Sequence, residues 1–138
     1  MEDVSFQEKS LWLMFASLVV GFGFYFAMVL PPGAADVLPQ QVVLFVVAVV
    51  MLVVMQVVGH IVIAIIDRRT ATDERDRLIA LKGTRNAGYV LATGVFLALC
   101  AALVTDGNFV FTHVLLASWV LAQLVEIGSQ LVFYRRGA

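Results

Sequence analysis

The chain has 138 residues, of which 62% are hydrophobic and 14% are charged, and its mean hydropathy is +0.97. An ordinary soluble domain has about 45–50% apolar and about 25% charged residues, so this composition excludes a soluble globular protein. The formal net charge of −1 lacks the basic excess of a nucleic-acid-binding protein. We therefore expect a protein of the lipid bilayer that does not bind nucleic acid directly.

Four apolar segments are long enough to cross a bilayer, which takes about 20 consecutive apolar residues. They are residues 10–30, 42–66, 86–104 and 109–133. Lipid offers no hydrogen-bond partner to the backbone, and four strands are too few to close a barrel, so the spans must be helices. The sequence predicts an all-α membrane protein, a single domain over residues 1–138 with four transmembrane helices in an antiparallel bundle.

The basic residues predict how this bundle is oriented. Every Lys and Arg lies before the first span, in the segment 67–85 or after the fourth span. The only charged residues in the other two connections are Asp36 and Asp106. Lys and Arg close to span ends are retained on the cytoplasmic side. We expect a multi-pass protein of the bacterial inner (plasma) membrane, with both termini and the loop 67–85 in the cytoplasm.

The cytoplasmic loop carries its own signal for the start of a helix. Thr72 is placed to cap the first amides, and Asp73 and Glu74 in the first turn complement the helix dipole. Leucine and isoleucine then alternate with basic residues, which predicts a short interfacial helix that leads into the third span. Gly83 marks the expected bend between the two helices.

The two halves of the chain resemble each other at a shift of 67 residues. Gly21-Phe22 then falls on Gly88-Tyr89, Gln56 on Gln123, and Arg68-Arg69 on Arg135-Arg136. A duplicated helical hairpin explains these matches, and transporters built from such repeats often place their sites at the repeat interface. The alternative is chance similarity between valine-rich helices, with arginines expected at the cytoplasmic end of both hairpins in any case.

Polar residues inside the spans are the first candidate site. An ionisable side chain in the hydrocarbon region costs about 2.5–3.5 kcal/mol and is a functional candidate by default. At a rise of about 1.5 Å per residue, Glu126 and His60 lie at similar depths, roughly 8–9 Å from the midplane on the cytoplasmic side. The spacing within each span predicts two polar stripes that face protein. The predicted intramembrane polar site comprises Gln56, His60, Trp119, Gln123, Glu126 and Gln130.

Two interpretations of this polar site stay open. In the first, Glu126 and His60 exchange a proton or hold a cation. In the second, they form interhelical hydrogen bonds that contribute about 0.6 kcal/mol each and serve assembly only. Trp119 is expected to pack in the core, and His113 to be solvated or bonded to a loop. The chain has no motif for a metal, a nucleophile or a phosphate, so we expect no enzyme activity, no metal and no cofactor.

The densest charge cluster is the second candidate site. It is a predicted cytoplasmic docking patch formed by Asp73, Glu74, Arg75, Asp76, Arg77 and Ile79. As the solvated start of a helix, it would hold only exposed ion pairs worth tenths of a kcal/mol. As a functional surface, it would bind a cytoplasmic partner.

The same residues carry a resemblance. Asp73-Glu74-Arg75-Asp76 followed by Ile79 is similar to the D-E-R-D-x-x-I motif that precedes the third span in small four-helix inner-membrane proteins of bacteria and archaea. The resemblance covers about residues 67–97 and implies a membrane protein of unknown function. Some proteins of this kind are encoded beside helix-turn-helix regulators, which implies a cytoplasmic regulatory protein as partner. The resemblance assigns no role to Glu126 or His60.

The sequence therefore favours a non-enzymatic assembly or regulatory protein of the inner membrane that docks a partner through the loop 67–85. The alternative is a small dimeric transporter or proton-coupled channel that uses Glu126 and His60. The expected partners are the lipid bilayer, a second copy in a homodimer, and a cytoplasmic regulatory protein.

Overall fold

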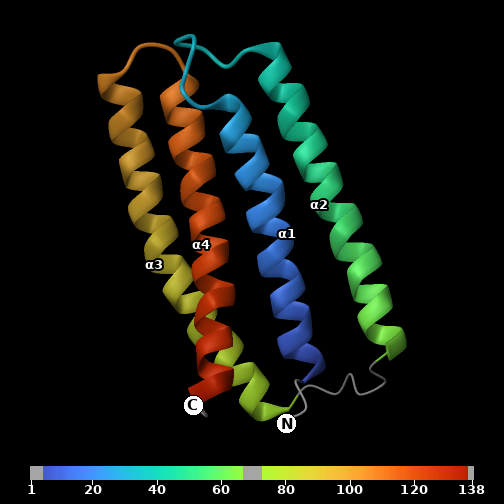
Figure 1. The fold of residues 1–138 in the computed structure, drawn as a ribbon. Helices are drawn as coiled ribbons and strands as arrows, with labels where there is room; N and C mark the ends of the chain where they lie inside the picture. The colour runs from blue at the N-terminus through green and yellow to red at the C-terminus, as the bar shows by residue number, and fades with distance from the viewer. Residues whose placement is uncertain (1–4, 67–72, 137–138) are drawn as a thin grey trace.

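The protein was analysed as a computed structural model that describes residues 5–66 and 73–136. It folds into the helices α1 (Phe6–Val29), α2 (Pro39–Ile66), α3 (Glu74–Val104) and α4 (Phe109–Arg136), with no strand in these two ranges. Each helix is long and apolar enough to cross a membrane. The all-α class and the antiparallel four-helix bundle are confirmed (Figure 1). The protein is a multi-pass membrane protein.

The helices lie in the spatial order α3, α4, α1, α2 (Figure 1). α4 contacts α3 on one side and α1 on the other, and α1 contacts α2. The two hairpins α1–α2 and α3–α4 therefore meet mainly through α1 and α4. The predicted hairpin duplication stays a prediction, although its proposed repeat interface corresponds to this α1–α4 contact.

The core of the bundle lies along α1 and α4. One cluster of buried apolar side chains comes from these two helices, and its members are Leu11, Leu18, Phe22, Val120, Ile127 and Leu131. α3 adds Ile79, Ala87 and Ala98 to the buried side chains. α2 contributes much less, because only Gln41 and Ala48 are buried among its 28 residues. A helix that is apolar all round and mostly uncovered suits lipid as its surroundings, so α2 packs on α1 with one side only.

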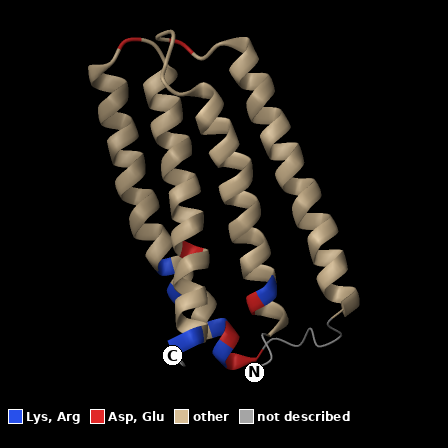
Figure 2. Ribbon diagram, viewed as in Figure 1, with Lys and Arg blue, Asp and Glu red and all other residues tan. Residues whose placement is uncertain are grey.

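Charge is unequally distributed between the two ends of the bundle (Figure 2). Basic side chains of the described residues gather where α1 begins, α3 begins and α4 ends; we call this the basic end. The opposite end carries the connections 30–38 and 105–108, and we call it the loop end. Here Asp36 Oδ1 accepts from the amide of Asn108 at 3.0 Å, and Asn108 Oδ1 accepts from the amide of Val37 at 2.8 Å. These bonds join the two hairpins at the loop end.

α3 differs from the expectation for the loop 67–85. One continuous helix runs from Glu74, so residues 74–85 are not a loop, and the separate interfacial helix is wrong. Gly83 is no bend. It is buried, and a Cβ there would meet Gln130 Cγ at 2.6 Å and the Glu126 carbonyl oxygen at 2.9 Å. Glycine at this position therefore permits close approach of α3 and α4.

The predicted cap of this helix is also wrong. Asp73, not Thr72, is the N-cap, and residues 67–72 lie outside the described ranges. Asp73 Oδ1 accepts from the amide of Asp76 at 2.8 Å, while Asp76 Oδ2 accepts from the amide of Asp73 at 3.1 Å. A carboxylate at N3 completes such a reciprocal capping box. The helix therefore starts one residue later than the threonine signal indicated.

Candidate functional site

His60 and Glu126 do not form the expected pair. His60 Nδ1 lies 2.7 Å from the carbonyl oxygen of Gln56, and Nε2 lies 2.6 Å from the hydroxyl of Ser10. A carbonyl oxygen can only accept, so Nδ1 donates to Gln56, and Nε2 is the ring nitrogen that bonds the Ser10 hydroxyl. Both ring nitrogens of His60 are thus engaged within the α1–α2 hairpin.

Glu126 belongs to the other hairpin. Its Oε1 accepts from the hydroxyl of Thr84 on α3 at 2.7 Å. Counting about 1.5 Å per residue from Phe109, Glu126 lies roughly 25 Å from the loop end of α4, close to the edge of a hydrocarbon core of about 30 Å. The prediction of one shared relay is corrected, because the two groups hydrogen-bond within different hairpins.

The remaining residues of the predicted polar site also divide between the hairpins. Gln56 Nε2 donates to the Ser17 hydroxyl at 2.8 Å, which joins α2 to α1. Gln130 packs beside Gly83 on α3. Gln123 and Gln130 are half-buried. Trp119 makes an edge contact with Phe22, but 41% of it is exposed, so it does not pack fully in the core.

Sequence reasoning missed the most buried polar contact in the described bundle. The Tyr25 hydroxyl on α1 lies 2.9 Å from His113 Nε2 on α4, and both residues are 5% exposed or less. His113 Nδ1 lies 2.8 Å from the carbonyl oxygen of Phe109, and the Tyr25 and His113 rings stack at 5.8 Å. The expectation that His113 is solvated or bonded to a loop is therefore wrong. A depth count could have found the pair, because each residue lies four positions from the loop end of its helix.

The predicted docking patch divides into two faces. Ile79 is 1% exposed and packs inside the bundle, so it is not part of an accessible surface. Asp76 Oδ1 accepts from the Tyr134 hydroxyl at 2.5 Å, and Arg75 donates to the Tyr134 carbonyl oxygen at 3.2 Å. These two residues fix the start of α3 to the end of α4. Asp73, Glu74, Arg75 and Arg77 remain exposed.

The exposed face of this segment forms a regular stripe, which we call the α3 stripe. Its members follow the spacing i, i+3, i+4, i+7 and i+11, which places them on one side of a helix. They are Glu74, Arg77, Leu78, Leu81 and Arg85, all exposed. Leu78 and Leu81 are 58% and 67% exposed. The stripe thus combines two apolar side chains with charges of both signs.

Among the described residues, no group of three or more His, Cys, Asp or Glu side chains is placed to hold a metal ion. Comparisons of the chain with protein-family models, with curated proteins and with solved structures found no match. The similarity to the D-E-R-D-x-x-I proteins therefore stays a prediction.

Proposed function

We propose that the protein is a non-enzymatic assembly or regulatory component of the bacterial inner membrane, and that the α3 stripe docks a cytoplasmic protein. The observation that carries the proposal is the rigid extension of α3 beyond the length that a membrane requires. Its 31 residues span about 46 Å, against a hydrocarbon core of about 30 Å. If Val104 lies at the loop-end boundary, the first three turns of α3 lie outside the hydrocarbon core, beside the end of α4.

The contacts at the start of α3 support a preformed recognition surface. The capping box and the bond from Tyr134 to Asp76 hold the first turn against α4. Lys82 Nζ lies 5.3 Å from the ring centroid of Phe133, which adds a further contact between the start of α3 and the end of α4. A surface that is ordered before binding loses less entropy when a partner docks.

The composition of the stripe favours a protein over lipid headgroups. If Val104 lies at the loop-end boundary, Leu78 lies roughly 9 Å beyond the hydrocarbon edge at the basic end. Two exposed leucines that lie between Arg77 and Arg85, with Glu74 before them, match an amphipathic helix of complementary charge. An anionic membrane surface would attract Arg77 and Arg85 but repel Glu74, so binding to headgroups alone leaves the acidic end of the stripe unexplained.

Transport through Glu126 and His60 has weaker support. The two groups hydrogen-bond to Thr84 and Ser10 in separate hairpins, and Glu126 lies near the membrane edge. These contacts suit the assembly of each hairpin. Homodimerisation is compatible with either role.

Site-specific photocrosslinking in native membranes tests the docking proposal. A photoreactive residue at Leu78 should form a discrete protein adduct, whereas the same residue at Leu103, 87% exposed near the loop end, should not. Exchanging the two charges with Glu74→Lys and Arg77→Glu keeps the net charge but reverses its pattern. We expect roughly three- to tenfold less adduct, because each exposed ion pair contributes about 0.2–1 kcal/mol.

Arg136→Glu on α4 serves as the matched control and should leave the adduct unchanged, since Arg136 lies outside the stripe. An adduct that is insensitive to the charge exchange, or no adduct at Leu78, would contradict docking. Ion flux in liposomes that is lost in Glu126→Gln would instead promote the transporter.

A further inference from the structure

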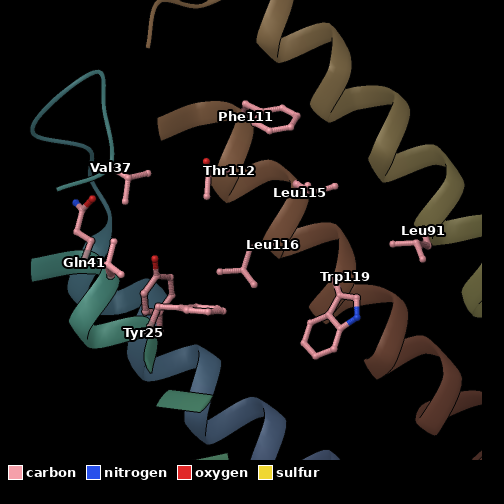
Figure 3. Close-up of a pocket in the computed structure, with 11 residues that line it drawn as sticks. Tyr25, Val37, Gln41, Leu91, Phe111, Thr112, Leu115, Leu116 and Trp119 are labelled. Atoms are coloured by element: carbon pink, nitrogen blue, oxygen red, sulfur yellow. The ribbon is translucent and has the colours of Figure 1, made fainter. Parts of the chain in front are cut away.

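The loop-end half of the bundle holds a cavity of about 440 Å³ whose lining includes residues from all four helices. Figure 3 shows Gln41, Tyr25, Thr112 and Trp119 around this space, with Leu91 and Leu115 from α3 and α4. Ligand pockets have volumes of about 300–1,000 Å³ and are mostly apolar with a few polar groups. The cavity matches that description and plays no part in the docking proposed above.

The polar groups of the cavity lie toward the loop end. Gln41 is the third residue of α2 and Thr112 the fourth residue of α4, whereas Trp119 lies ten residues after Phe109. At about 1.5 Å per residue, Trp119 lies roughly 15 Å from the loop end of α4, which is half of the hydrocarbon core. The cavity therefore extends over one leaflet, with its polar end outward and its apolar end near the midplane.

The length of the cavity limits what can fill it. A transmembrane helix of a partner or of a second copy crosses about 30 Å, twice the length of this space, and cannot lie inside it. A slender flexible chain can, and the polarity of the cavity matches the direction of an acyl chain in that leaflet.

The charges of the loop end bear on the headgroup, because Val37 lines the cavity and follows Asp36 directly. The connections 30–38 and 105–108 carry Asp36 and Asp106 and contain no Lys or Arg. A free fatty acid or an anionic phospholipid would place its negative charge beside these carboxylates without a basic partner. An ammonium headgroup is complementary to them.

We propose that this cavity binds one acyl chain of a phospholipid with an ammonium headgroup, in the leaflet at the loop end. The chain passes Tyr25 and Leu115 and ends against Trp119. The oxygen-bearing end of the lipid lies beside Thr112 and Gln41.

Tryptophan quenching by brominated lipids tests the proposal on the full-length protein in phosphatidylglycerol vesicles, whose lipid has no ammonium group to compete for the cavity. The chain has two tryptophans, so Trp12→Phe leaves Trp119 as the reporter. Phosphatidylethanolamine with a dibrominated chain should quench Trp119 emission in a saturable manner at low mole fraction. Brominated phosphatidylglycerol and brominated fatty acid should quench only in proportion to their mole fraction.

Thr112→Phe places a ring in the cavity. Quenching by brominated phosphatidylethanolamine should then no longer saturate and should rise in proportion to the mole fraction of this lipid. Thr93→Phe is the matched control, because Thr93 is exposed on α3 and does not line the cavity. Leu115→Phe provides a second cavity variant if Thr112→Phe loses its helical circular dichroism. Proportional quenching by phosphatidylethanolamine, or saturation that survives both cavity variants, would overturn the proposal. Saturable quenching by brominated fatty acid would also overturn the proposal. So would quenching that weakens as the protein density in the vesicles rises, because a second copy would then cover Trp119.

Discussion

Gly94→Ala is expected to destabilise the bundle by about 1–3 kcal/mol, the cost of overpacking a well-packed interface. Gly94 is buried where α3 meets α4, and an added Cβ would overlap the side chain of Ser118 and lie 3.3 Å from its Cα. The serine side chain is short and bonds the Val114 carbonyl oxygen at 2.6 Å, so it cannot easily move aside. The helices must separate instead. Reversible unfolding in mixed micelles measures the change.

Gly88→Ala provides the control on the same helix. A Cβ at Gly88 meets nothing within 4 Å, so this variant should be neutral or more stable by up to about 1 kcal/mol, since alanine favours helix. Equal effects of the two substitutions would show that α3 and α4 do not approach each other at Gly94.

Tyr25→Phe is expected to cost about 1–3 kcal/mol, because it leaves Nε2 of the buried His113 without its hydrogen-bond partner. His113→Leu should cost a similar amount by leaving the Tyr25 hydroxyl unpaired. The double variant should lose less than the sum, since contacting groups are not additive. We expect a coupling energy of about 1–2 kcal/mol, the upper part of the range for hydrogen bonds between transmembrane helices.

Tyr89→Phe removes the same hydroxyl from a side chain that is 70% exposed on α3 and should leave stability unchanged. Strict additivity of Tyr25→Phe and His113→Leu in the double-mutant cycle would contradict the contact between α1 and α4. The measurement is the free energy of unfolding of all four variants under the same micelle conditions.

Hydropathy was sufficient to predict the spans. The segments 42–66, 86–104 and 109–133 lie inside α2, α3 and α4, and the segment 10–30 ends one residue after α1 does. Burying the backbone in lipid requires a helix, so apolar length alone determines the element. Hydropathy could not show that α3 continues through residues 74–85, because a helix outside the hydrocarbon is no longer required to be apolar.

The partners of polar groups were harder to predict than their positions. Glu126 and His60 share a depth, but depth does not say which helices are neighbours, and their bonds go to Thr84 and Ser10. Those partners are small hydroxyl residues that are common in membrane helices and give no distinct sequence signal. Spatial order decides the pairing, and the order α3, α4, α1, α2 emerges only from the packed structure.

Docking to a cytoplasmic protein requires the α3 stripe to face the cytoplasm, so locating the stripe relative to the membrane tests the docking function most directly. Reporters of cytoplasmic and periplasmic location can be fused after Ala138, inserted at residues 70–72, and inserted at Gly33, which lies in the connection 30–38. The account predicts cytoplasmic signals from the first two positions and a periplasmic signal from Gly33. A periplasmic signal after Ala138 or at residues 70–72 would contradict the proposed orientation and, with it, the docking function.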